Sequence, residues 1–351
     1  MIDVYFHAKY LKNSLMELVV KEIDINNNSR IDVFDTLKGI GIIFVILGHY
    51  SFDSSLIKFI YSFHMPLFFL ISGCLYSTKI ELSFTKTVKK LFFKIIIPYV
   101  LFVLISLLVC HEHGDLIKRL FYIRAMGPNE ALWFLPLYVI VVSTFVAILQ
   151  FLKKYILIDY AIYLLCVVSI MITPKFQQIF PDACILMLGV LPVAVAFMCI
   201  GYEFYKNKTF LYRNDSFVSF ILFGIGIIIL AYAPIANIAN INSYLYFPCA
   251  LCFCYPLYHV ANNIKSKFLI FVGKNSILYL GLHSLIADIC NKQQYIYWFS
   301  EHFDGLMLWI LKIIIITALT TVIIYCCNYF IIKINRIVSK LLNKNLLKNG
   351  L

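Results

Sequence analysis

The sequence is short of charged residues. Asp, Glu, Lys and Arg make up 14% of the 351 residues, whereas 62% are hydrophobic, and the mean hydropathy is +0.87. A soluble domain needs a charged surface, and this composition cannot supply one. The chain is therefore predicted to be an all-α integral membrane protein. Only the segment before Arg30 and the tail after Ile332 are polar for any length, so no second soluble domain is expected.

Acidic residues are scarcer than basic ones: 18 Asp and Glu stand against 30 Lys and Arg, which gives a net charge of +12. Such an excess can indicate nucleic-acid binding. In a membrane protein, however, basic residues gather in cytoplasmic loops, where they face anionic lipid headgroups. The positions of the charges favour this interpretation, and no nucleic-acid partner is expected.

Two further features are missing. The eleven cysteines show no spacing typical of a disulfide framework, and most lie in apolar runs, where they are interpreted as small packing residues. A secretory signal peptide is not recognisable either, because residues 1–30 are too polar. We expect the first spanning helix to act as its own uncleaved insertion signal.

What the chain does have is a series of apolar runs of about 20 residues, the length that spans a bilayer. Together they predict a bundle of about ten transmembrane helices, centred near residues 43, 67, 101, 142, 164, 194, 225, 252, 279 and 319. With both termini cytoplasmic, 22 of the 30 Lys and Arg residues fall in inner segments and five in outer ones, as the positive-inside rule requires. The predicted parts are a polar or amphipathic cytoplasmic N-terminal segment (1–29), a transmembrane domain (30–335) and a basic cytoplasmic tail (336–351).

The first apolar run, LKGIGIIFVILGHY at residues 37–50, contains two ionisable side chains, Lys38 and His49. Eleven residues make about three helical turns, so both lie on nearly one face, about 16 Å apart along the axis. Asp35, three residues before Lys38, can pair with it near the cytoplasmic end. Either residue alone is compatible with snorkelling to an interface. The pair on one stripe favours a functional role.

The second run, YSFHMPLFFLISGCLY at residues 61–76, places His64 at the same depth as His49. Pro66 removes a backbone donor, which membranes tolerate beside a cavity or a compensating neighbour. Ser72 and Gly73 are small and allow close helix approach. Two imidazoles lack the carboxylate or cysteine companions of a zinc site, so no metal is predicted.

Several segments taken together resemble the membrane-bound acyltransferase family 3, and in particular the fucose 4-O-acetylase-like sugar O-acetyltransferases. The segments follow the family's order over residues 30–335 and read RIDVFDTLKGIGIIFVILGH, SFHMPLFFLISG, KIIIPY, ALWFLPLY, VAFMCIGYEFY and VGKNSILYLGLH. The resemblance implies a ten-helix enzyme of the plasma (inner) membrane. It would transfer an acyl group, usually acetyl from acetyl-CoA, to a hydroxyl of a cell-surface polysaccharide or a lipid-linked sugar. Polysaccharide-assembly enzymes are possible partners.

The resemblance also assigns roles on the first two helices. His49 is the candidate general base or transient acyl carrier, since an imidazole suits proton transfer at neutral pH. His64 is a second donor that would orient the acceptor or the oxyanion. Asp35 would fix Lys38, which would hold the CoA end of the donor from the cytosolic half. The family commonly has arginine at the position of Lys38. In this chain a compact ammonium therefore replaces a planar guanidinium that can donate two parallel hydrogen bonds.

Five further residues are candidates for substrate binding: Ser72, Glu130, Trp133, Asn275 and His283. Each also has a plainer explanation, such as an interfacial aromatic belt for Trp133, a solvated loop for Glu130, or a satisfied core histidine for His283. A transporter or flippase for a lipid-linked sugar is the alternative function, because intramembrane His, Asp and Lys also make proton relays. Against it, the two halves show no inverted repeat. An inactive scaffold is a third interpretation, although His49 and His64 are both present.

Overall fold

The computed structural model describes residues 32–50, 54–78, 83–110, 115–126, 129–152, 158–181, 184–206, 215–232, 237–292 and 305–348. Every regular element within these ranges is helical. The predicted N-terminal segment 1–29 lies outside the described residues. An all-helical protein rich in apolar runs is expected for a membrane domain, because a helix satisfies its own backbone hydrogen bonds in lipid.

Among the described residues, seven helical segments are long and apolar enough to cross a membrane: Asp32–Tyr50, Ser54–Ser77, Phe84–Val109, Glu130–Leu152, Asp159–Ile179, Ile185–Lys206 and Trp309–Cys327. An eighth span would combine α13 (Lys267–Lys274) with α14 (Ser276–Lys292), which meet at an angle of 85°. The other two predicted centres lie in α11 (Ser216–Tyr232) and α12 (Tyr246–Asn263), which do not meet these criteria. The all-helical membrane class is confirmed, and the count of ten spans stays a prediction.

Several of these spans are interrupted. The second consists of α2 (Ser54–Tyr61) and α3 (His64–Ser77), so His64 begins the second piece and does not open the span. The third consists of α4 (Phe84–Leu91), a π-helical turn and α5 (Ile97–Cys110). The fourth and sixth each begin with a 3₁₀ turn, before α8 (Phe134–Leu152) and α10 (Leu191–Lys206), while α9 (Ile158–Ile179) forms the fifth.

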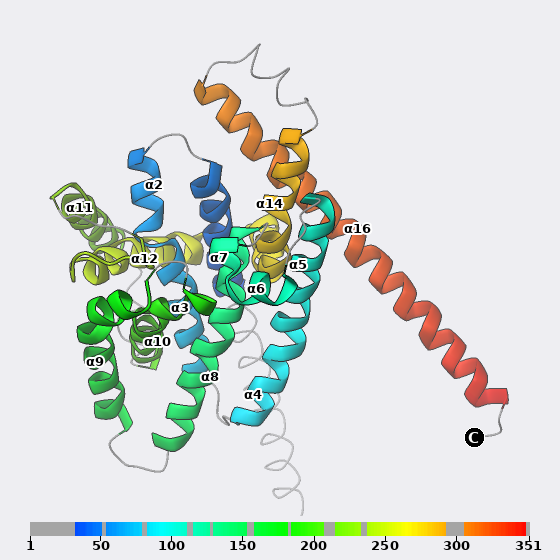
Figure 1. The fold of residues 1–351 in the computed structure, drawn as a ribbon, viewed down its shortest axis with the longest axis horizontal. Helices are drawn as coiled ribbons and strands as arrows, with labels where there is room; N and C mark the ends of the chain where they lie inside the picture. Colours follow the sequence, from blue (N-terminus) through cyan, green and yellow to red (C-terminus); the bar gives the residue numbers. More distant parts are fainter. Residues whose placement is uncertain are drawn as a thin grey trace, which may run out of the picture.

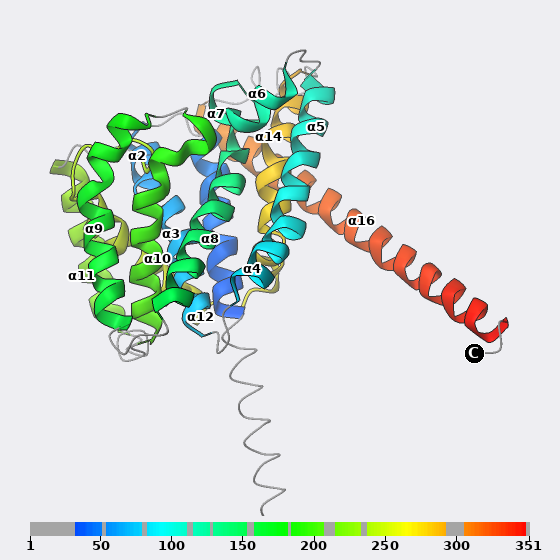
Figure 2. The same ribbon diagram turned by 60° about the horizontal axis from the view of Figure 1, so that its bottom comes forward.

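The helices α3 and α10 pack closely at the centre of the bundle, next to α8 and α9 (Figures 1 and 2). Glycine makes this possible on both sides. A Cβ at Gly73 of α3 would overlap the carbonyl oxygen of Met198, and one at Gly201 of α10 would overlap that of Leu70. Small residues at helix interfaces let backbones approach in this way, as expected for Gly73.

The first helix, Asp32–Tyr50, packs against α13 through two more glycines. A Cβ at Gly39 would overlap the carbonyl oxygen of Leu269, and one at Gly273 would overlap that of Asp35. The first helix and the bend between α13 and α14 are therefore held in fixed register. This contact lies at the end of the bundle where the first helix begins.

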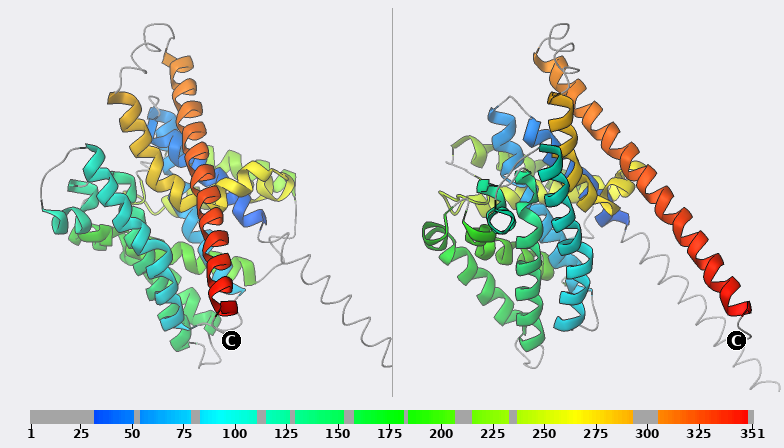
Figure 3. Two further views of the ribbon diagram at one scale, coloured as in Figure 1. Left: turned by 90° about the vertical axis from the view of Figure 1, so that its right-hand side faces the viewer. Right: turned by 45° about the vertical axis from the view of Figure 1, so that its right-hand side comes forward.

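Two short helices, α6 (Leu116–Phe121) and α7 (Ile123–Met126), lie at the other end of the bundle (Figure 2). The first helix ends and α3 begins toward this end. It is called the outer end here, because the positive-inside rule predicts that it faces away from the cytoplasm. The last helix, α16 (Gly305–Lys348), contacts α14 through a 2.6 Å hydrogen bond between the hydroxyls of Tyr279 and Thr321. Its C-terminal half projects away from the bundle (Figure 3).

Candidate active site

His49 lies at the outer end of the first helix, among other ionisable groups. Its side chain is exposed, and its ring centroid is 5.4 Å from that of His283 on α14, with the ring planes tilted by 53°. His64 and Arg124 are also close enough to interact with it electrostatically. His49 therefore lies near three other ionisable side chains. No hydrogen bond within the described part of the chain occupies its ring nitrogens, so both are available to a substrate.

His64 is held by the break between α2 and α3. The helix α2 ends at Tyr61, and the carbonyls at a helix C-terminus lack intrahelical partners. The carbonyl of Ile60 receives the imidazole Nδ1–H of His64 at 2.8 Å. A carbonyl can only accept, so Nδ1 carries the proton and the neutral ring presents Nε2 as an acceptor. The ring also lies 5.0 Å from that of Tyr61.

His283 has the same tautomer for a similar reason. Its Nδ1–H donates to the carbonyl of Tyr279, one helical turn earlier, at 2.9 Å. Nε2 is therefore unprotonated and has a lone pair that can accept a hydrogen bond. The side chain is fully buried, and Nε2 has no hydrogen-bond partner among the described residues. Tyr50 donates its hydroxyl to the backbone carbonyl of His283 at 3.3 Å, which ties the first helix to α14 beside the two rings.

A second layer of ionisable groups surrounds these imidazoles. Tyr61 lies within electrostatic reach of both Arg124, on α7, and Glu130, which begins the fourth span. Arg124 in turn reaches His49. Glu130 was predicted from the sequence as a substrate contact, whereas Arg124 and Tyr61 were not. The only available signal for Tyr61 was its position three residues before His64, and Arg124 looked like an ordinary charge in an outer loop.

Asn129 is another residue that the sequence did not single out. It is fully buried, and its side-chain NH₂ donates to the carbonyl of Gly281 on α14 at 3.0 Å. Within the part of the chain that the structure describes, its Oδ1 has no hydrogen-bond partner. Gly281 is needed here, since a Cβ would come within 2.5 Å of the Phe102 ring. Asn129 therefore fixes the turn of α14 that carries His283 and offers a second buried acceptor nearby.

The other end of the first helix carries a separate group of charges. Lys38 and Asp35 form the expected ion pair at 2.6 Å, with the carboxylate almost buried and the ammonium partly exposed. Lys274 of α13 lies 3.6 Å from the carboxylate of Asp32. Next to it, Asn275 ends α13 by donating its amide to the carbonyl of Phe271 at 2.8 Å. Two cations and two carboxylates thus meet where the first helix contacts the bend.

Ser72 and Trp133 are not part of either group in the described contacts. Ser72 lies about two turns along α3 from His64, and its hydroxyl bonds to the Tyr138 hydroxyl at 2.8 Å and to the carbonyl of Phe68 at 2.8 Å. These bonds join α3 to α8. Trp133 is 7% exposed and packs edge-on against Phe134. Their predicted roles in substrate binding remain predictions.

The outer group can carry out acid–base chemistry. It contains an accessible imidazole, two imidazoles whose Nε2 atoms are acceptors, and a guanidinium that can stabilise negative charge. Three helices deliver the histidines, so the arrangement exists only in the folded chain. Within the described ranges, no group of three or more His, Cys, Asp or Glu side chains is placed to hold a metal ion.

The fold is thus that of an all-helical membrane protein with a group of ionisable side chains at one end of its bundle. A family model described as an acyltransferase domain matches residues 31–329. This is well over half of the chain, and the protein therefore belongs to acyltransferase family 3 and is a membrane acyltransferase. No curated protein and no solved structure matches the chain significantly.

Proposed function

We propose that the protein is a sugar O-acetyltransferase of the fucose 4-O-acetylase-like kind, which transfers acetyl from acetyl-CoA to a hydroxyl of a cell-surface polysaccharide or a lipid-linked sugar. The proposal places it in the plasma (inner) membrane with ten spans and both termini in the cytoplasm. One observation carries it: His49, His64 and His283 come from three helices and meet at the outer end of the bundle. An acceptor on the cell surface would arrive at this end.

In the proposed reaction, Nε2 or Nδ1 of His49 takes the proton from the acceptor hydroxyl. The hydroxyl oxygen attacks the thioester carbonyl carbon, a C–O bond forms and the carbonyl oxygen gains negative charge. Arg124 lies close enough to stabilise that charge. The C–S bond then breaks, and His49 returns the proton to the departing thiolate of CoA. His49 is the best base of the three because its ring is exposed and free of intramolecular hydrogen bonds.

His64 and His283 act as positioning residues in this proposal. Both have Nδ1 committed to a backbone carbonyl, so each directs an Nε2 acceptor outward from a fixed ring. An acceptor is what a protonated His49 or a sugar hydroxyl needs as a partner. Tyr61 and Glu130 extend the polar surface toward the outer loop, where they contact the acceptor.

The donor would approach from the cytoplasmic end of the first helix. Lys38 lies about 16 Å from His49 along the axis, and its ammonium remains partly exposed beside Asp35. Lys274 adds a second exposed cation at the same end. These two cations suit the phosphates of CoA. The predicted role of Asp35 is to hold the Lys38 ammonium in position.

Acceptor-dependent release of CoA tests the proposal. The protein in lipid nanodiscs is given acetyl-CoA and oligosaccharides from a surface polysaccharide, and the free thiol is followed by a colorimetric reagent. His49→Ala is expected to lower the rate by about 10²–10⁴-fold, the usual contribution of a general base. His259→Ala is the matched control. His259 lies near the C-terminal end of α12, away from the three histidines of the candidate site, and its ring hydrogen-bonds to the hydroxyl of Ser216. An unchanged rate in His49→Ala removes His49 from the chemistry, and glycan transport without CoA release supports the transporter instead.

A further inference from the structure

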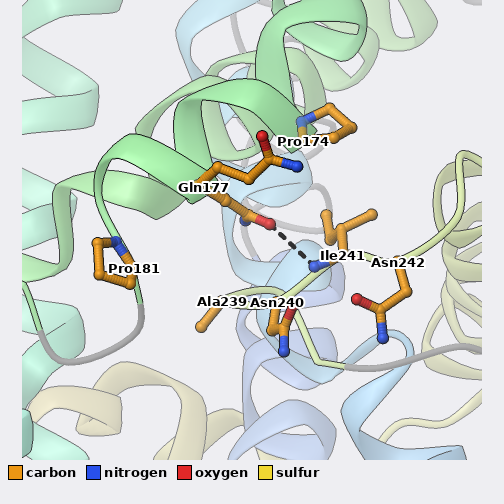
Figure 4. Close-up of a pocket in the computed structure, with 8 residues that line it drawn as sticks. Pro174, Gln177, Pro181, Ala239, Asn240, Ile241 and Asn242 are labelled. Atoms are coloured by element: carbon orange, nitrogen blue, oxygen red, sulfur yellow. Dashed lines mark hydrogen bonds between the residues drawn. The ribbon is translucent and has the colours of Figure 1, made fainter.

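A separate hollow opens at the outer end of the bundle, between the end of α9 and the loop before α12 (Figure 4). Its volume is about 560 Å³, within the range of about 300–1,000 Å³ that is typical of small-molecule sites. Eight residues line it: Pro174, Gln177, Gln178, Pro181, Ala239, Asn240, Ile241 and Asn242. Four of the eight are primary amides and none is charged.

One of the amides builds the wall. The amide of Gln177 is buried and donates to the carbonyl of Ile238 at 2.9 Å, while its oxygen accepts from the backbone N–H of Ile241 at 2.9 Å (Figure 4). The Asn237 side chain closes the same turn by accepting from the N–H of Ala239 at 2.8 Å. The loop is therefore fixed in the absence of any ligand, and a ligand would not have to order it.

The other three amides are available. Gln178, Asn240 and Asn242 are exposed, and their side chains make no hydrogen bond within the described part of the chain. Asn240 and Asn242 lie two residues apart in the loop, and their side chains point to the same side of it (Figure 4). Each primary amide offers two donors and one acceptor oxygen. Pro174 and Pro181 add partly exposed apolar surface beside them, and the buried Ile241 lies behind.

This composition selects the chemistry of the ligand. A sugar hydroxyl is both a donor and an acceptor, and amides satisfy both functions, while the C–H face of a sugar ring fits against proline. An anionic ligand would lose hydration here without meeting a lining cation. The lining thus suits an uncharged carbohydrate better than a phosphate or a uronic acid.

The hollow is connected to the candidate active site through the backbone. The lining loop leads into α12, whose first residue, Tyr246, donates its hydroxyl to the carbonyl of Tyr61 at 3.3 Å. Tyr61 contacts the ring of His64. Gln177 near the end of the fifth span and His64 near the start of the second lie toward the same end of the bundle, because successive spans alternate in direction.

From these observations we propose that the hollow is a binding subsite for uncharged sugar residues of the acceptor, separate from the histidine group and used to hold the glycan chain while one of its hydroxyls reaches His49. The inference rests on the proposed function, since it assumes that the acceptor is a saccharide. The inference adds the substrate class, because it states that the part of the acceptor glycan bound between α9 and the loop before α12 consists of neutral sugars.

A glycan array tests the subsite without any acyl donor. The purified protein in nanodiscs is applied to neutral hexose, deoxyhexose and N-acetylhexosamine oligomers, printed beside oligomers that contain uronic or sialic acid. Neutral oligomers are expected to bind the wild type, and the double variant Asn240→Ala/Asn242→Ala is expected to bind them at least about tenfold more weakly, for the loss of two or more hydrogen bonds. Asn262→Ala, an exposed amide near the other end of α12, is the matched control and is expected to retain binding.

Equal binding by the double variant, a preference for acidic oligomers, or no binding of any oligomer to the wild type would each overturn the subsite. Thermal unfolding of the double variant shows that it is folded; exposed substitutions of this kind cost little. The transfer assay separates the two proposals. If no acceptor causes release of CoA, but the double variant no longer binds neutral glycans, the subsite is supported and the proposed reaction is refuted. If transfer occurs and the double variant has an unchanged KM for the acceptor, the reaction stands and the subsite falls.

Discussion

Replacement of His283 by asparagine separates the two nitrogen atoms of its ring. Nδ1 donates to the carbonyl of Tyr279, and Nε2 is a buried acceptor without a partner in the described ranges. The amide of asparagine can replace Nδ1 alone. The same chain already shows this geometry twice, because Asn275 and Asn263 each donate Nδ2 to the carbonyl four residues earlier, at 2.8 and 2.9 Å. His283→Asn is therefore expected to keep the backbone contact and lose only Nε2.

The magnitude follows from what Nε2 can do. If it accepts a hydrogen bond from protonated His49, the bond is charge-assisted and contributes about 1.5–3 kcal/mol. At about 1.4 kcal/mol for each factor of ten, kcat is expected to fall by about 10–150-fold. The KM for acetyl-CoA should stay unchanged, because the proposed donor site at Lys38 lies at the other end of the first helix. Initial rates of CoA release over a range of both substrates measure the two parameters separately.

Two comparisons make the result interpretable. His283→Ala removes both nitrogen atoms and leaves a void at a fully buried position, so it is expected to lower the Tm in nanodiscs, whereas His283→Asn keeps a value closer to the wild type. A merely structural role predicts loss of Tm without any specific loss of kcat in the asparagine variant. Full activity in His283→Asn would show that Nε2 takes no part in the reaction.

Two further predictions concern the inner end of the first helix. Lys38→Arg should retain activity, since a guanidinium can also pair with Asp35. Lys38→Met should raise the KM for acetyl-CoA several-fold and lower the Tm, because it leaves the nearly buried carboxylate of Asp35 unpaired. Equal KM values in the two variants would contradict the proposed donor role of Lys38. Gly273→Ala should lower the Tm and the activity together, since its Cβ would overlap the Asp35 carbonyl and overpacking costs about 1–3 kcal/mol. Gly224→Ala, with nothing within 4 Å of its Cβ, should leave the Tm equal or higher, as alanine favours a helix, and a matching loss there would refute the steric explanation.

The sequence was sufficient to predict which polar residues share a depth in the membrane. The depth of a residue is estimated by counting from the end of its apolar run, which needs the sequence of that run alone. This count predicted the same depth for His49 and His64. The structure brings them within electrostatic reach of each other. The pairing of Asp35 with Lys38 was equally predictable, since helical spacing alone puts the two side chains together.

Lateral position was not predictable in the same way. Nothing in the spacing of one helix says which other helix lies beside it, so the contact between His49 and His283, more than 230 residues apart, could only be raised as a possibility. Arg124 and Asn129 are harder still, because they lie in or next to loops, where hydropathy carries no signal. Their importance follows from contacts with His49 and with the carbonyl of Gly281, which require the packed bundle.

Glycine explains how the polar groups come together in an apolar protein. Gly39 and Gly273 let the first helix lie directly against α13, and Gly281 makes room for the Phe102 ring at the turn of α14 that carries His283. Between lipid-embedded helices the hydrophobic effect gives little drive for association, so close packing has to supply it. A larger residue at any of these three glycines is expected to push the packed elements apart. The ring centroids of His49 and His283 would then be more than their present 5.4 Å apart. The geometry of the histidine group is therefore determined as much by residues without side chains as by the imidazoles themselves.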